Sequence, residues 1–99
     1  MLCVLNERIK QLRTAHGYNQ VEFARLVGVT KQCVSNWEND NVIPSIEMLI
    51  KMADIFHVTT DYILGRDERA YIDVSNLSFE QRSHLSLLIN DFEKINNLK

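Results

Sequence analysis

Residues 20–37 read QVEFARLVGVTKQCVSNW, and the most informative pattern of the chain lies here. Apolar residues recur at helical spacing on both sides of Gly28, which predicts two short helices joined by a tight turn. Glycine adopts left-handed backbone conformations without steric cost, so Gly28 can end one helix and reverse the chain. The predicted inner faces consist of Phe23, Ala24 and Val27 before the turn, and of Val29, Val34 and Trp37 after it. Alanine at position 24 is small enough for two helices to cross closely.

The outward face of the helix after this turn is polar and almost uncharged. It consists of Thr30, Lys31, Gln32, Ser35 and Asn36. Hydroxyl and amide groups both donate and accept, which suits the edges of bases in a DNA major groove; an amide on adenine is the favoured pairing. The alternative is an ordinary solvated face, which would carry more Glu and Lys. We therefore interpret this face as a surface that contacts bases.

The spacing, the glycine and the apolar positions resemble the helix-turn-helix of the lambda-repressor, Cro and Xre family over roughly Leu5 to Gly65. The residues that stand in the family's register are Ala24, Gly28, Val34, Trp37 and Glu38. The resemblance implies a sequence-specific regulator of transcription, more often a repressor, whose second motif helix enters the major groove of double-stranded DNA. It implies no cofactor.

The resemblance also assigns roles to residues around the motif. Contacts with backbone phosphate are implied for Asn19, Gln20, Asn39 and Asn41. After Asn39 the family often has glycine and then a basic residue, whereas this chain has Asp40 and Asn41, so this loop lacks the usual positive charge. Arg13 and Glu38 match positions that pair the first helix with the end of the third, which is a structural role.

The remaining periodicity predicts an all-α protein. We expect a five-helix domain over residues 1–66, a charged connector over 67–77 and a C-terminal helical arm over 78–99. The first helix, about 5–16, should bury Leu5, Ile9 and Leu12. Asn19 with Glu22, and Ser78 with Gln81, have the spacing of capping boxes, and Thr30 and Ser45 are further N-caps.

The fourth and fifth helices complete the predicted domain. The fourth is expected to bury Ile46, Leu49, Ile50, Ala53 and Phe56, and the fifth, which opens at Val58 and Thr59 and closes at Gly65, to hold Tyr62, Ile63 and Leu64. Each helix alone is too short to be stable in water, so their apolar faces must close one core. Tyr71, Ile72 and Val74 give the connector some strand propensity, but we do not expect an edge strand there.

The last helix carries an apolar stripe of Leu85, Leu88, Phe92 and Ile95, spaced three, four and three residues apart. We favour a homodimer through this stripe, which would present two copies of the reading helix to a palindromic operator. The alternative is that the helix folds back over the fourth and fifth helices. A different class of function also stays open: the same fold can serve as an antitoxin or adaptor that binds a protein partner through this arm.

The charge balance and the missing catalytic motifs limit the other functions that the chain could have. Residues 1–66 hold seven Lys or Arg and seven Asp or Glu, so this part is neutral, and the whole chain is at −2. Because a basic footprint is usual for nucleic-acid binders, we expect modest non-specific affinity. No phosphate-binding glycine loop or Ser-His-Asp motif stands in the sequence, so we expect no enzyme.

The cysteines and histidines predict neither a disulfide framework nor a metal site. Cys3 and Cys33 do not form a CxxC pair, and the three His residues are scattered. Cys33 lies near the reading face, but only Lys31 could lower its pKa, so we do not favour a thiol switch. The absence of a long apolar run and of a secretory signal predicts a cytoplasmic protein without a membrane span.

Overall fold

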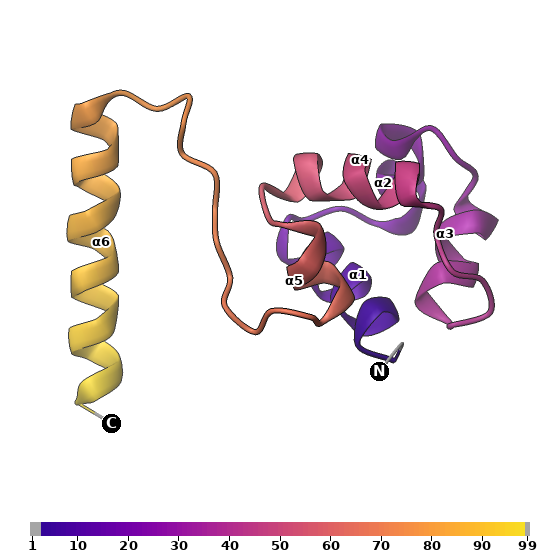
Figure 1. The fold of residues 1–99 in the computed structure, drawn as a ribbon, viewed down its shortest axis with the longest axis horizontal. Coiled ribbons are helices and arrows are strands. Elements are labelled where there is room, and N and C mark those ends of the chain that lie inside the picture. Colours follow the sequence, from indigo (N-terminus) through magenta and orange to yellow (C-terminus); the bar gives the residue numbers. More distant parts are fainter. Residues whose placement is uncertain (1–2, 99) are drawn as a thin grey trace.

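The computed structural model describes residues 3–98, and every regular element among them is a helix (Figure 1). The helices are α1 (Cys3–Ala15), α2 (Gln20–Val27), α3 (Lys31–Glu38), α4 (Ile46–Phe56), α5 (Thr60–Leu64) and α6 (Phe79–Asn97). The predicted all-α fold is thus confirmed. Among the described residues, no helix combines the length and the hydrophobicity that a membrane span requires.

Side-chain caps set the starts of α2 to α6. Asn19 and Ser78 form the two predicted capping boxes: each cap side chain accepts from the third helical N–H, and the backbone N–H of the cap donates to the side chain of that third residue. The hydroxyls of Thr30, Ser45 and Thr59 each accept one backbone N–H in the same way. The first helix begins at Cys3, ahead of the predicted start.

The first five helices enclose one core. Helix α1 packs on α3 and α5, α2 packs on α3 and α4, and α4 packs on α5. The buried apolar residues are Leu5, Ile9, Phe23, Ala24, Val27, Val34, Trp37, Leu49, Met52, Ala53, Phe56 and Ile63. Leu12, Tyr18, Val29 and Cys33 are among the partly buried residues that pack against this core. The apolar positions expected around Gly28 therefore lie where the sequence placed them.

The predicted inner face of α4 was wrong in part. Ile46 is 77% exposed and Ile50 is 50% exposed, whereas Met52 is fully buried with Leu49, Ala53 and Phe56. The α4 sequence carries two overlapping apolar stripes, and periodicity alone does not choose between them. The choice follows from packing, because α4 must contact α2 and α5 at the same time.

The connector leaves the bundle at a fixed point. Arg8 of α1 donates to the Tyr62 carbonyl and to Glu68 at 3.0 Å, and its guanidinium lies 4.0 Å from the centre of the Tyr62 ring. These contacts hold the start of the connector against α1 and α5. At the other end, Arg82 of α6 donates to the carbonyls of Val74 and Ser75. Residues 71–74 are irregular, not a strand.

Helix α6 stands apart from the bundle at the far end of the connector (Figure 1). None of its described residues is buried, and its predicted stripe is 38–55% exposed along its length. The helix therefore does not fold back over α4 and α5 in this structure.

Candidate nucleic-acid interface

The turn between α2 and α3 depends on Gly28. Its backbone is left-handed, with φ 88° and ψ 33°, and its N–H donates to the Ala24 carbonyl at 2.8 Å. The next N–H, of Val29, donates to the same carbonyl at 2.9 Å. This geometry ends α2 and turns the chain so that Thr30 can cap α3 immediately afterwards. The helix-turn-helix is thus built by local hydrogen bonds.

The inner side of α3 is anchored in the core. Val34 and Trp37 are buried, and Cys33 is partly buried beside them. Helix α3 packs on both α1 and α2 through this side. Such packing fixes the rotation of the helix about its axis, and therefore fixes which residues point outward.

The five predicted base-contact residues lie on the outer side and at the start of α3. Thr30, Lys31 and Gln32 are exposed, and Ser35 and Asn36 are half-buried. The amide nitrogen of Gln32 donates to Asn36 Oδ1 at 3.0 Å, which joins these two side chains into one pair. The Ser35 hydroxyl accepts from the amide of Asn39 at 3.2 Å. The structure therefore brings these five residues together as one polar surface.

Arg13 and Glu38 form a buried ion pair behind this surface. Arg13 Nε donates to Glu38 Oε2 at 2.6 Å and Arg13 Nη2 donates to Oε1 at 3.0 Å, a bidentate arrangement. The third nitrogen, Nη1, donates to the Tyr18 carbonyl at 2.8 Å. The pair joins α1, the α1–α2 loop and the last residue of α3. It fixes the end of α3 relative to the bundle.

The four predicted phosphate-contact residues lie near the start of α2 and after α3. Asn19, Asn39 and Asn41 are exposed and Gln20 is half-buried. Asn19 is occupied as the cap of α2, and the Gln20 amide donates to Glu38 Oε1 at 3.1 Å. Asp40 adopts φ 61°, the left-handed region for which the family's glycine would be suited. The loop after α3 thus keeps the turn without the glycine.

Two further residues hold the ends of the motif helices, and the sequence did not point to them. Asn6 of α1 donates to the backbone carbonyl of Glu38 at 3.1 Å. Lys51 of α4 donates to the carbonyl of Val27, the last residue of α2, at 3.2 Å, which favours that helix end electrostatically. A lysine on an exposed helix face carries no sequence signal for this contact, because the contact depends on how α4 packs.

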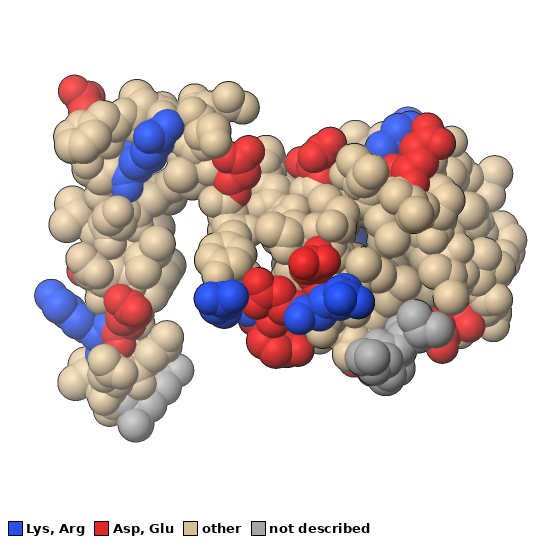
Figure 2. All heavy atoms as spheres, in the orientation of Figure 1, with Lys and Arg blue, Asp and Glu red and all other residues tan. Residues whose placement is uncertain are grey.

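The face of the molecule that Figure 2 shows carries few charges near α3. The right-hand end of the molecule in Figure 2, where Figure 1 places α3, is largely uncharged on the face shown. Elsewhere on that face Lys and Arg alternate with Asp and Glu. Of the positive side chains, Arg13 is neutralised by Glu38 and Arg8 by Glu68, whereas Arg25 of α2 and Lys31 at the start of α3 are exposed. Positive charge at the motif is thus limited and local.

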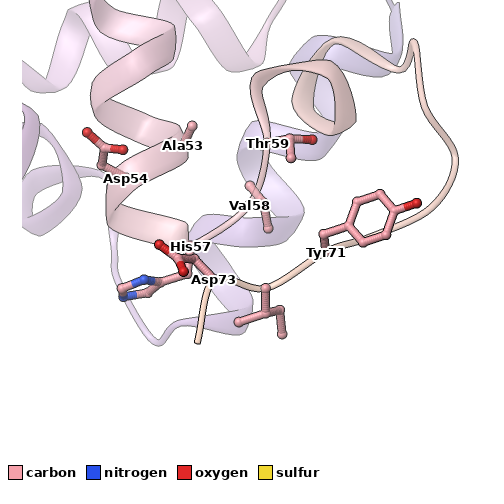
Figure 3. Close-up of a pocket in the computed structure, with 8 residues that line it drawn as sticks. Ala53, Asp54, His57, Val58, Thr59, Tyr71 and Asp73 are labelled. Carbon is pink, nitrogen blue, oxygen red and sulfur yellow. The ribbon is translucent and has the colours of Figure 1, made fainter. Parts of the chain in front are cut away.

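A separate cavity of about 230 Å³ lies between the α4–α5 corner and the connector (Figure 3). Its polar groups come from Asp54, His57, Thr59, Tyr71 and Asp73. The Thr59 hydroxyl is occupied as the cap of α5, and the Asp73 carboxylate accepts both the N–H and the hydroxyl of Ser75, which lowers the pKa of Asp73. The Thr59 and Asp73 groups thus serve local structure. The lining residues belong to α4, the α4–α5 turn and the connector, which lie away from α3 (Figure 1).

The chain matches known proteins over the five-helix part. A helix-turn-helix family model matches residues 9–63, which is more than half of the chain. The HTH-type transcriptional regulator ImmR of Bacillus subtilis (strain 168) is 38% identical over 64 residues, which are 65% of this chain and 50% of ImmR. The chain spans about half the length of the curated relatives it matches.

Two solved structures share the fold. The P22 c2 repressor protein in complex with a synthetic operator superposes with a TM-score of 0.60 at 28% identity, over 64% of this chain and 96% of that chain. The SinR protein/SinI protein complex superposes with a TM-score of 0.59 at 26% identity, over 96% of this chain and 99% of that chain. The matched segment contains the Gly28 turn and all of α3, and the chain therefore belongs to the helix-turn-helix family of the lambda-repressor, Cro and Xre type.

Proposed function

We propose that this chain is a sequence-specific DNA-binding regulator of transcription, and that it represses by occupying a promoter. The observation that carries the proposal is the outer surface of α3, where amide and hydroxyl groups stand on a helix whose rotation is fixed by the core. A rigid helix with such a face suits insertion into the major groove. The operator complex of the similar P22 c2 repressor supports this assignment.

Base contacts are centred on the Gln32–Asn36 pair. One N–H of Gln32 is held by Asn36 Oδ1, so the Gln32 side chain is oriented before DNA arrives. Its carbonyl oxygen and second N–H then match the donor and acceptor of an adenine. Lys31 reaches a guanine or a phosphate, and the Thr30 methyl group contacts a thymine.

Backbone contacts come from the helix ends. The start of α2 offers backbone N–H groups and the Gln20 amide, which suit a phosphate oxygen. Asn39 and Asn41 contact phosphate after α3. Because little positive charge surrounds these groups, binding to random DNA is weak and depends less on salt than for a basic domain.

Replacement of Gln32 by alanine tests the base contact. We expect a loss of roughly 1–3 kcal/mol on an operator selected from a random duplex library, and relaxed specificity at one base pair. The matched control is Gln11→Ala, which removes an exposed glutamine of α1 that takes no part in the proposed contacts. Equal losses on the operator and on random duplex would contradict the assignment.

We further propose that α6 makes the protein a homodimer. Its stripe of Leu85, Leu88, Phe92 and Ile95 is exposed over a 19-residue helix. Two such stripes packed together remove apolar surface from water, and this burial stabilises the dimer by roughly 25 cal/mol for each Å² of apolar surface buried. A two-fold dimer then presents two α3 helices to half-sites about one helical turn apart, ~34 Å.

Sedimentation of the chain that lacks residues 76–99 tests the dimer. The full chain should be dimeric at tens of micromolar, whereas the truncated chain should be a folded monomer that binds a palindromic site far more weakly. The control is Glu93→Ala, which changes an exposed charge of α6 and should leave the dimer intact. A monomeric full chain, or a dimeric truncated chain, would show that α6 is not the interface.

The second candidate is a role in protein binding through α6. The same exposed stripe favours it, and so does the similarity to a SinR protein/SinI protein complex, which extends over 96% of this chain. In this function α6 pairs with a different protein instead of a second copy. A monomeric full chain that captures one partner from the host, together with failure to select any duplex, would favour this candidate over the first.

A further inference from the structure

The carboxylate of Glu38 is the point where three parts of the chain meet. It accepts two hydrogen bonds from Arg13 of α1 and a third, at 3.1 Å, from the side-chain nitrogen of Gln20. Gln20 is the first residue of α2, whereas Glu38 is the last residue of α3. One buried group therefore links the start of the first motif helix to the end of the second.

The hydrogen bond fixes which end of the Gln20 amide points inward. An ionised carboxylate only accepts hydrogen bonds, so it selects the orientation in which the nitrogen of Gln20, not the oxygen, faces Glu38. That nitrogen carries two N–H donors, and the bond to Glu38 uses one of them. Gln20 is half-exposed, and its side-chain nitrogen makes no other hydrogen bond within residues 3–98. The second donor is thus available to a ligand.

Arg13 makes this arrangement compatible with a bound phosphate. A lone carboxylate close to DNA would repel the backbone. Here the guanidinium of Arg13 contacts both carboxylate oxygens and compensates the charge. Glu38 can therefore orient Gln20 without adding a net negative charge at the surface.

We propose that Glu38 is a positioning residue for the DNA backbone: it holds the Gln20 amide so that its second N–H donates to a phosphate oxygen. The inference rests on the proposed DNA-binding function. Phosphate contacts set the register of a protein on its duplex. Because Glu38 belongs to α3, the link fixes the phosphate contact at α2 relative to the base-contact surface of α3.

The test compares Gln20→Met, which keeps the length of the side chain and removes both donors, with the matched control Gln11→Met on the exposed side of α1. We expect Gln20→Met to bind both the selected operator and random duplex roughly tenfold more weakly, as for a lost hydrogen bond to a charged group. The slope of affinity against salt should stay unchanged, because a neutral amide releases no counterion. Gln11→Met should bind like the wild type.

The role of Glu38 is tested by Glu38→Gln alone and combined with Gln20→Met. If Glu38 acts through Gln20, the double variant binds DNA no more weakly than whichever of the two single variants has the lower affinity. Glu38→Gln also weakens the ion pair with Arg13, so a second measurement avoids this substitution. In the wild type, NMR follows the side-chain amide protons of Gln20. On addition of duplex, the Gln20 amide proton that is hydrogen-bonded to Glu38 should keep its chemical shift, and the chemical shift of the other amide proton should change.

The outcomes separate this inference from the proposed function. If the wild type binds no selected duplex, the proposed function and this inference both fail. If the wild type binds duplex and Gln20→Met binds equally well, only this inference fails. It fails too if the losses from Gln20→Met and Glu38→Gln add, or if both amide protons move because Gln20 leaves Glu38 on binding.

Discussion

Replacing Arg13 by alanine should remove a large part of the free energy of unfolding of the five-helix bundle. The side chains of Arg13 and Glu38 are only 9% and 3% exposed, and Arg13 makes three hydrogen bonds, two to Glu38 and one to the Tyr18 carbonyl. Without Arg13, the buried carboxylate keeps Gln20 as its side-chain donor but loses its compensating charge. Removing one partner of a buried ion pair costs roughly 3–5 kcal/mol. A small domain has a total stability of about 5–15 kcal/mol, so this loss is a large part of it.

The expected change in melting temperature follows from this cost. One kcal/mol corresponds to about 4–8 °C in a domain of this size, so Arg13→Ala should lower the midpoint by roughly 12–40 °C. Thermal and urea unfolding can be followed by circular dichroism and by the fluorescence of Trp37, which is buried in the native state. Arg25→Ala is the matched control, because Arg25 is exposed on α2 and its loss should cost within about 0.5 kcal/mol.

A double-mutant cycle with Glu38→Ala completes the experiment. Removing both charges should cost less than the sum of the two single losses, because neither buried charge is then left without its partner. The reasoning is refuted if Arg13→Ala stays within about 1 kcal/mol of the wild type, or if the two losses are additive.

Two other predictions concern the turn at α5 and the connector. Gly65→Ala should destabilise the protein more than Gly28→Ala: both residues have positive φ, but a β-carbon at Gly65 would lie 2.8 Å from Val4 Cγ1, whereas at Gly28 the nearest atom is Lys51 Nζ at 3.8 Å. We expect about 1–2 kcal/mol for Gly28→Ala and a larger loss for Gly65→Ala in urea unfolding, and equal losses would contradict the steric argument. Ser75→Ala should raise the pKa of Asp73 toward its ordinary value, because the Ser75 hydroxyl is the largest cause that lowers it. A carboxyl titration by NMR measures this pKa, and an unchanged value would show that the hydroxyl does not contribute.

The helices and the turn between α2 and α3 could be predicted from local sequence. Asn19, Thr30, Ser45 and Ser78 start their helices as predicted, because a cap bonds to a backbone N–H only three residues away. The left-handed turn at Gly28 is equally local, since it depends on the missing β-carbon. The apolar faces of α2 and α3 could be predicted for the same reason: their spacing is a property of the helix itself.

Which of the available helix faces are buried, and which donors find a partner, depends on how the helices pack together. Packing buries Met52 of α4 and leaves Ile46 and Ile50 exposed. Packing also brings Lys51 to the carbonyl of Val27 at the end of α2. It also attached Gln20 to Glu38, although the sequence marked each residue for a separate role. These contacts join residues far apart in the chain, and they form only when several helices pack together. Spacing along one helix fixes a direction around its axis, but the neighbouring helices determine what lies in that direction.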